Sequence, residues 1–398
     1  MEAEEARTIG YALWRVRDER RKSLQVVADL AGMSKSHLSR IERGERSPTL
    51  AEIVALAAAL QISVSELTRL PVPAPANGHT DSATEAVALA LDGIETGHPR
   101  GMVLPVVVLR DRVARIHAQR RECRFAEVAT ELPGLIRDLH TTLATGADHG
   151  ELLDLAVYLH VHVTRLWLAH TAAPVHLIRR VVFLAQRLAQ ERDDVTTLAV
   201  AGFGLASALE ASGAFELGRT ALDSITLPPT TAATAGLVCN LTLSHGHAAV
   251  LDGRPGDAAA PAAAALEIAE RFGAAAEVDS LGFVHAPVDV ELHRMAMALE
   301  AKEPDRVVSI AGNVDPERHP FAVGQAQIRL HYGRALARLR GRHEDAVRAL
   351  RRAETIHPHI VLRDPMVRDV LAVLLRSSGR DATGEELRGM ARRAGLPG

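Results

Sequence analysis

Side chains that donate hydrogen bonds crowd one short stretch near the N-terminus, where residues 33–48 read MSKSHLSRIERGERSP. On a helix that starts at residue 35, five of them fall within one arc of about 140°. They are Lys35, Ser36, Ser39, Arg40 and Arg43. Leu38 and Ile41 fall on the other side of the same helix. Ammonium, guanidinium and hydroxyl groups are donors suited to phosphate oxygens and base edges. The spacing therefore predicts a helix anchored by two aliphatic side chains that presents a basic ridge outward.

The segments around this ridge carry signals for the starts and ends of helices. Serine N-caps and terminal glycines bound two short helices, over 24–31 and 35–43. The N-caps are Ser23 and Ser34, and the terminal glycines are Gly32 and Gly44. Flanking helices are expected over 8–20, over 49–60 and from Ser63. Two short helices joined by a glycine turn, the second with a basic ridge, are typical of a helix-turn-helix.

Residues 9–68 resemble the XRE, or Cro/repressor-type, helix-turn-helix family. The matching residues are Ile9, Gly10, Leu13, Arg17, Ser23, Ala28, Gly32, Ser34, Leu38, Ser39, Ile41, Glu42, Gly44, Ser47, Pro48 and Leu60. The resemblance implies a five-helix domain that binds double-stranded operator DNA. It also implies that helix 35–43 lies in the major groove and faces base edges with Lys35, Ser36 and Arg40.

The same resemblance implies contacts to the DNA backbone and one structural ion pair. The expected backbone contacts are Ser23, Leu24, Ser39, Arg43, Arg46 and Ser47. Arg17 and Glu42 match a family ion pair that ties the first helix to the third. The family often has Gln or Glu after the cap of the second helix, where this chain has Leu24 and Val26. We therefore expect the second helix to hold a phosphate through its backbone N–H groups alone.

Charge is distributed unevenly along the 398 residues. Residues 7–48 carry ten Lys and Arg against five Asp and Glu, a net charge of +5. The whole chain has a formal net charge of −3, which leaves −8 outside that segment. A basic head on an acidic body is expected to confine DNA binding to the head.

Beyond residue 100 the segments are amphipathic and helical, and turns recur between them. Hydrophobic residues make up 47% of the chain but aromatic residues only 3%, which favours helix-on-helix packing by Leu and Ala. Turn tips are expected near Glu122, Thr171, Ser212, Asp252, Lys302, Gly341 and Gly379. A period of about 40 residues with two helices per unit predicts an α-solenoid.

The units of this body resemble tetratricopeptide (TPR) repeats, because each has small residues, Leu, a glycine turn and an acidic residue in order. Residues 131–138 resemble a segment of large actinobacterial XRE regulators that carry such a body. The predicted fold class is therefore all-α, with a five-helix head followed by a TPR-like α-solenoid.

Prolines at 71, 73 and 75 and Gly78 predict a linker. The expected domains are a DNA-binding domain over 1–70, a Pro-rich linker over 71–82 and a sensor and dimerisation domain over 83–398.

Histidines and glycines in the body do not have the spacing that metal or nucleotide binding needs. His160 and His162 are two residues apart, so their side chains point about 200° apart on an α-helix and cannot share a metal ion. Gly202 and Gly204 begin a GxGxxS string, which close helix packing explains better than a dinucleotide. The sequence therefore predicts no enzyme, no cofactor and no metal site.

Cysteine usage and hydropathy favour a cytoplasmic, nucleoid-associated protein. The two cysteines, Cys123 and Cys239, form no close-spaced framework, which indicates a reducing compartment. The acidic N-terminus is not a signal peptide, and no apolar run predicts a membrane span.

These patterns together predict a sequence-specific transcriptional regulator that forms a homodimer. Its concave face is expected to bind a peptide, a small molecule or a protein effector. The effector candidates are His160, Arg165, Arg179, Asn240 and His245, and solvated polar side chains are the alternative.

A second hypothesis is a protein-interaction scaffold that its head localises to DNA. Deleting residues 1–70 would separate the two, because only a regulator loses its transcriptional effect. An antitoxin is a weaker reading, because antitoxins are usually much shorter.

Overall fold

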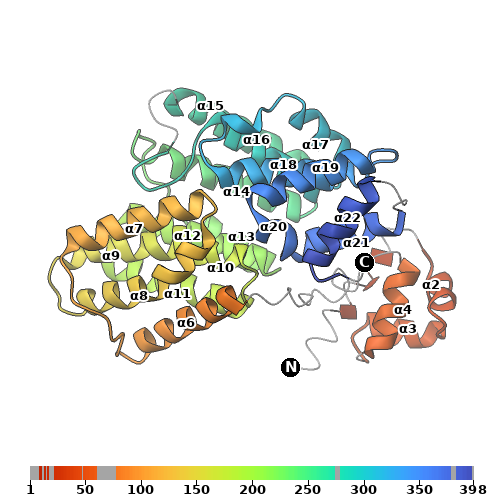
Figure 1. Ribbon diagram of the computed structural model, residues 1–398, viewed down its shortest axis with the longest axis horizontal. Coiled ribbons are helices and arrows are strands. Elements are labelled where there is room, and N and C mark those ends of the chain that lie inside the picture. The colour runs from red at the N-terminus through yellow and green to blue at the C-terminus, as the bar shows by residue number, and fades with distance from the viewer. Residues whose placement is uncertain are drawn as a thin grey trace.

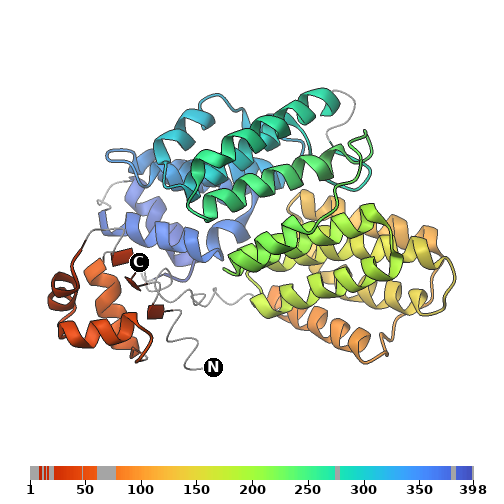
Figure 2. The same cartoon turned by 180° about the vertical axis from the view of Figure 1, so that it is seen from behind.

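The computed structural model describes residues 9–10, 13–14, 16–17, 22–46, 48–60, 78–273, 278–377 and 382–396. This part is helical nearly throughout, and its β-structure is an isolated bridge between Val278 and Val284. The predicted all-α fold class is confirmed: a helix-turn-helix head precedes a body of helical hairpins (Figure 1). Seen from behind, the hairpins form two halves that meet along the middle of the molecule (Figure 2).

The head packs three described helices, α2 (Leu24–Leu30), α3 (Lys35–Glu42) and α4 (Leu50–Leu60), with the helical residues before Arg17. Its core is formed by Leu13, Val16, Val27, Ala28, Leu38, Ile41, Ile53, Leu56, Ala57, Ala59 and Leu60. This cluster shares no member with the hydrophobic clusters of the body. Gly10 allows the first helix to approach α3 closely, because a Cβ there would lie 2.3 Å from the carbonyl oxygen of Ile41.

The body contains both long helices and short irregular turns. Its α-helices are α6 (Gly78–Glu95), α7 (Val106–Arg121), α8 (Phe125–Leu143), α9 (His149–Tyr158), α10 (Arg165–His170), α11 (Val175–Arg192), α12 (Val195–Ala211), α13 (Phe215–Asp223), α14 (Ala235–Leu251), α15 (Ala259–Gly273), α16 (Pro287–Glu300), α17 (Pro304–Ala311), α18 (Ala322–Leu336), α19 (His343–Ile356), α20 (Pro358–Leu362), α21 (Pro365–Ser377) and α22 (Ala382–Arg393). A π-helix, η1 (Leu159–Thr164), joins α9 to α10. The 3₁₀ turns are η2 (Pro255–Ala258) and η3 (Pro316–Arg318).

The predicted turn tips fall between consecutive helices of the body. Those near Glu122, Thr171, Ser212, Asp252, Lys302 and Gly341 are confirmed. Three of these turns have a left-handed backbone conformation at a glycine, which adopts it readily. Gly213, Gly253 and Gly341 have φ of 79°, 78° and 73°. The tip predicted near Gly379 lies outside the described residues, between α21 and α22.

Helix α6 begins at Gly78, inside the segment that the sequence predicted as linker over 71–82. Residues 78–82 are therefore helical, and residues 71–77 lie outside the described part of the chain. At the other end of the body, α20 lies close to the first helices. The Arg363 guanidinium after α20 is 2.9 Å from an Asp81 carboxylate oxygen in α6. The first and last parts of the body thus meet through side chains.

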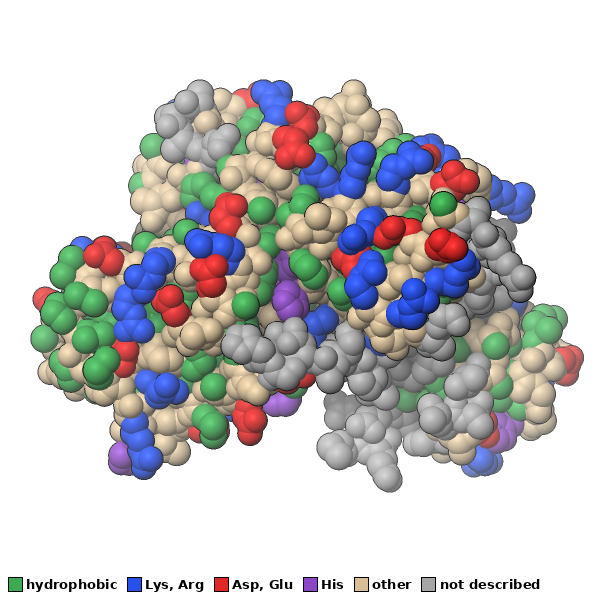
Figure 3. Space-filling model, in the orientation of Figure 1, with side chains coloured by type: hydrophobic (Ala, Val, Ile, Leu, Met, Phe, Trp, Pro, Cys, Tyr) green, Lys and Arg blue, Asp and Glu red, His purple; other side chains and the backbone are tan. Residues whose placement is uncertain are grey.

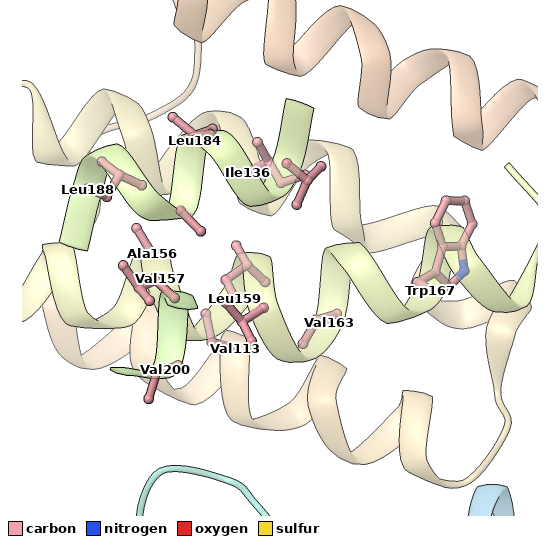
Figure 4. Packing of buried hydrophobic residues seen from close by; sticks show 14 of the residues in the cluster. Val113, Ile136, Ala156, Val157, Leu159, Val163, Trp167, Leu184, Leu188 and Val200 are labelled. Atoms are coloured by element: carbon pink, nitrogen blue, oxygen red, sulfur yellow. The ribbon is translucent and has the colours of Figure 1, made fainter. Parts of the chain in front are cut away.

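The largest hydrophobic core surrounds the π-helix. Leu159, Val161, Val163 and Trp167 are each fully buried, and they pack with residues of α7, α8, α11 and α12 (Figure 4). Within the described residues, the helical run His149–His170 is long and apolar enough to cross a membrane, but most of it is buried inside the protein. It therefore has the character of a core helix.

Close packing also accounts for the glycines of α12. A Cβ at Gly202 would lie 2.8 Å from Ile225 Cγ1, and one at Gly204 would lie 3.0 Å from Val161 Cγ2. Both glycines are therefore needed for helix packing, as the sequence led us to expect.

Candidate nucleic-acid interface

Helix α3 is held in the head by its cap, its buried side and its end. Ser34 Oγ accepts a hydrogen bond from the His37 backbone N–H at 3.2 Å, which caps the helix. Leu38 and Ile41 are fully buried in the core of the head. Gly44, with φ of 68°, ends the helix by taking a left-handed conformation. The predicted geometry of two aliphatic anchors below an outward ridge is present.

The ridge carries three exposed side chains that the sequence assigned to base reading: Lys35, Ser36 and Arg40. No hydrogen bond or ion pair is present for Lys35 or Arg40 within the described residues, so both cationic groups are available. Ser36 Oγ lies 3.2 Å from Ser34 Oγ. Ser39, expected to contact the DNA backbone, is half-buried beside this ridge.

Two arginines expected to contact phosphates lie near carboxylates instead. Arg43 Nε is 3.0 Å from Glu45, and Arg46 Nη2 is 3.8 Å from Glu52. The backbone N–H of Thr49 donates to Glu52, which lowers the pKa of that carboxyl and keeps it charged. A phosphate would have to compete with these carboxylates for the two guanidinium groups. Ser47, the third residue predicted there, lies outside the described residues.

The seven-residue α2 begins at the predicted cap. Ser23 Oγ accepts from the Val26 backbone N–H at 3.3 Å. Ser23 is exposed and Leu24 is half-buried, so the start of α2 is open to solvent. Their contact with DNA stays a prediction.

Arg17 and Glu42 form the ion pair that the resemblance implied. Arg17 Nε and Nη2 donate to the two oxygens of Glu42 at 2.7 and 2.9 Å, while Nη1 donates to the carbonyl of Lys22. The two side chains are only 12% and 7% exposed. This bidentate pair fastens the first helix to the end of α3.

The structure does not bring the five predicted effector residues into one cluster. His160 is fully buried, and its Nε2 lies 2.9 Å from His140 Nε2. Asn240 is buried and donates to the carbonyls of Gly236 and Val284, which is a structural role.

The other three candidates differ in burial and in their partners. Arg165 is buried and donates to the carbonyl of Val161 at 3.2 Å. Arg179 is half-buried on α11. His245 is exposed and lies 3.7 Å from Asp223. The sequence placed these polar residues on helices correctly, but which faces they occupy depends on long-range packing.

Sequence reasoning missed a group of buried and half-buried basic side chains in the body. His117 and Arg120 are 2% and 5% exposed, and His170 and His357 meet at 3.2 Å although they are 187 positions apart in sequence. One signal was available for α7: Val113, Ile116 and Arg120 follow helical spacing, which puts Arg120 on the buried side. No local signal links α10 to α20.

An apolar pocket of about 290 Å³ lies between α14, α15, α16 and α17. Val250 and Met297 line it with several alanines. Arg294 and Arg306 at its edge each donate a hydrogen bond to a glutamate three residues before them, at 2.6 and 2.9 Å. None of the predicted effector residues lines this pocket.

The capped α3, its buried anchors and its open basic ridge define a DNA-binding helix-turn-helix domain. Residues 15–67 match the helix-turn-helix family model, which covers most of the head. The chain therefore carries a helix-turn-helix domain of the XRE type.

Comparison with solved structures finds one distant neighbour. It is the crystal structure of Bacillus thuringiensis PlcR in complex with the peptide PapR7 and DNA. The match has a TM-score of 0.32 and 14% sequence identity, and covers 77% of this chain and 94% of that chain. A similarity of this size supports no functional argument. No curated protein matches the chain.

Proposed function

We propose that this protein is a sequence-specific transcriptional regulator that reads operator DNA with α3. The observation that carries the proposal is the pair of exposed cationic side chains, Lys35 and Arg40, on the face opposite the buried Leu38 and Ile41. A cationic group held in the major groove suits the O6 and N7 acceptors of guanine. Ser36 between them tolerates several bases. Arg43 and Arg46 then hold the sugar-phosphate backbone on either side.

Dimerisation follows from the size of this reading helix. One α3 has eight residues, which offers too few base contacts for useful specificity. Two heads would read half-sites about 34 Å apart, or a multiple of that spacing. The proposed division is a DNA-binding domain over 1–70, a connector over 71–82 and a helical body over 83–398 that dimerises and binds a peptide, small-molecule or protein effector. Such a protein acts in the cytoplasm, on the nucleoid.

Arg40→Ala is expected to weaken operator binding by about 1–3 kcal/mol and to relax specificity at one base pair, because the substitution removes a base contact. Arg46→Ala, the matched variant, is expected to weaken operator and random DNA about equally and to reduce the salt dependence by about one charge. Both effects are measured by titrating labelled operator and random duplexes at several fixed salt concentrations.

Selection of genomic fragments by the purified protein supplies the operator for that measurement. Wild type should enrich a two-fold symmetric site, and Arg40→Ala should not. If both variants lose the same affinity on operator and on random DNA, α3 does not read bases.

A further inference from the structure

Two arginines inside the body are buried without an acidic partner. Arg120 on α7 is 5% exposed and Arg165 on α10 is 8% exposed. Arg120 Nη2 lies 3.3 Å from His117 Nε2, and its Nε makes no hydrogen bond in the described part of the chain. Arg165 donates from Nε to the Val161 carbonyl. No carboxylate pairs with either guanidinium among the described residues.

Both guanidinium groups remain charged at neutral pH. Burial, then the charges of Arg121 and Arg165, lower the pKa of Arg120 to about 9. Burial lowers the pKa of Arg165 to about 10. A third cation, Arg121, donates to the carbonyl of Gly282 and lies over the ring of Phe321 at 4.2 Å. Arg120 and Arg165 thus carry positive charge in the interior, and the half-buried Arg121 adds to it.

Among the described residues, the groups around Arg120 and Arg165 supply no compensating negative charge. On one side, His117 Nδ1 lies 2.6 Å from the Tyr158 hydroxyl, and its ring stacks 5.5 Å from His162. On the other side, the His357 ring stacks 4.5 Å from Phe125. Burial lowers the pKa of these histidines, so they are neutral at pH 7.

The buried carboxylate that acts on this region, Asp279, already accepts hydrogen bonds from other groups. Asp279 accepts hydrogen bonds from the backbone N–H groups of Leu237, Leu281 and Phe283 at 2.8 to 3.0 Å. Its charge acts on Arg121, and it pairs with neither Arg120 nor Arg165. An isolated buried charge costs several kcal/mol, so a protein that retains two of them normally pairs them with something.

We propose that Arg120 and Arg165 form the binding site for an oxyanion, a carboxylate or phosphate group of a small ligand, at the centre of the body. Planar guanidinium forks match such groups in geometry and charge. Figure 3 shows histidine and cationic side chains at the surface between the two halves of the body. The neutral imidazoles and Phe125 pack around this part of the interior. This inference deepens the proposed function, because it names the chemistry of the effector.

The test is thermal unfolding of the full-length protein in sodium phosphate, sodium acetate and sodium chloride at equal ionic strength. We expect phosphate or acetate to raise the unfolding midpoint by about 5 °C over chloride at saturation, since an anion that binds only the folded state stabilises it. The anion that gives the shift identifies the oxyanion. Equal midpoints in all three salts would overturn the proposal.

Arg120→Met and Arg165→Met remove the charge and keep most of the side-chain volume. In chloride, each variant should unfold at or above the wild-type temperature, because a charge without a partner no longer has to be buried. Each should also lose the shift caused by the anion. Arg115→Met is the control on the same helix, because Arg115 is exposed and paired with Glu131 at 2.9 Å, and it should keep the shift. Variants that unfold earlier but keep the full shift would show that the arginines are structural.

Operator affinity, measured in the same salts, separates this inference from the proposed function. If the protein shows the anion shift but enriches no operator, the oxyanion site stands and the proposed function is wrong. If the protein binds operator but shows no anion shift, DNA binding stands and the oxyanion site is wrong.

Discussion

Arg17→Leu is expected to unfold much of the DNA-binding head and to abolish operator binding. The substitution leaves Glu42, whose side chain is 7% exposed, without the guanidinium that donates to both its oxygens. Breaking a buried ion pair by removing one partner costs about 3–5 kcal/mol, because the remaining charge stays desolvated. A head of this size has little stability to lose. Hydrogen exchange of the head amides and operator titration would both report the loss.

Arg43→Leu is the matched control for that prediction. Arg43 also pairs with a glutamate, but Arg43 and Glu45 are 59% and 49% exposed. Exposed pairs contribute about 0–1 kcal/mol, so the head should stay folded. Any DNA affinity that Arg43→Leu loses then comes from a missing phosphate contact. Equal protection of the head amides in Arg17→Leu and wild type would show that the buried pair does not hold the domain together.

The head could be predicted from sequence because its signals are local. A serine three residues before the amide it caps, or a glycine at a left-handed turn, acts within one turn of helix. The roles of Ser34 as a cap and Gly44 as a helix end could therefore be predicted from the neighbouring sequence alone. The same holds for the glycine turns of the body, such as Gly213 and Gly341. Turn positions and helix order follow from such signals.

The interior of the body could not be predicted in this way. Which side of a helix is buried depends on partners far along the chain, as in the pairs His140 with His160 and His170 with His357. Periodicity also assumes α-helical geometry, whereas residues 159–164 form a π-helix. His160 and His162 have different neighbours in that π-helix, His140 and the ring of Tyr158.

The consequence for the candidate sites differs between the two parts. The face of α3 followed from the positions of Leu38 and Ile41, because a surface helix on a small core has one buried side. The effector candidates were chosen as polar residues on helices that are covered on more than one side. His160 and Asn240 are therefore buried in the structure, and Arg120, which has no acidic partner among the described residues, was not selected.

Acidification is expected to destabilise the body steeply between about pH 6.5 and pH 4. Burial lowers the pKa of His140 to about 4, and lowers that of His170 and His331 to about 3. An unfolded chain binds protons at these histidines near pH 6.5, whereas the folded protein does not. Stability is therefore complete above pH 6.5 and falls as the pH drops towards the folded pKa. Each such histidine contributes a slope of about 1.4 kcal/mol per pH unit in that window, as an upper bound.

Urea unfolding at a series of pH values measures this slope, and His140→Asn tests its origin. His140 faces His160 in the core, and desolvation is the cause of its low pKa. At pH 8 the His140→Asn protein should be less stable than wild type, because the contact of His140 with His160 is replaced by a different side-chain contact. As the pH falls, this difference in the free energy of unfolding should shrink, because the variant takes up one fewer proton when it unfolds. A slope identical to that of wild type would mean that His140 already binds its proton in the folded protein, and that the buried histidines do not set the acid limit of the fold.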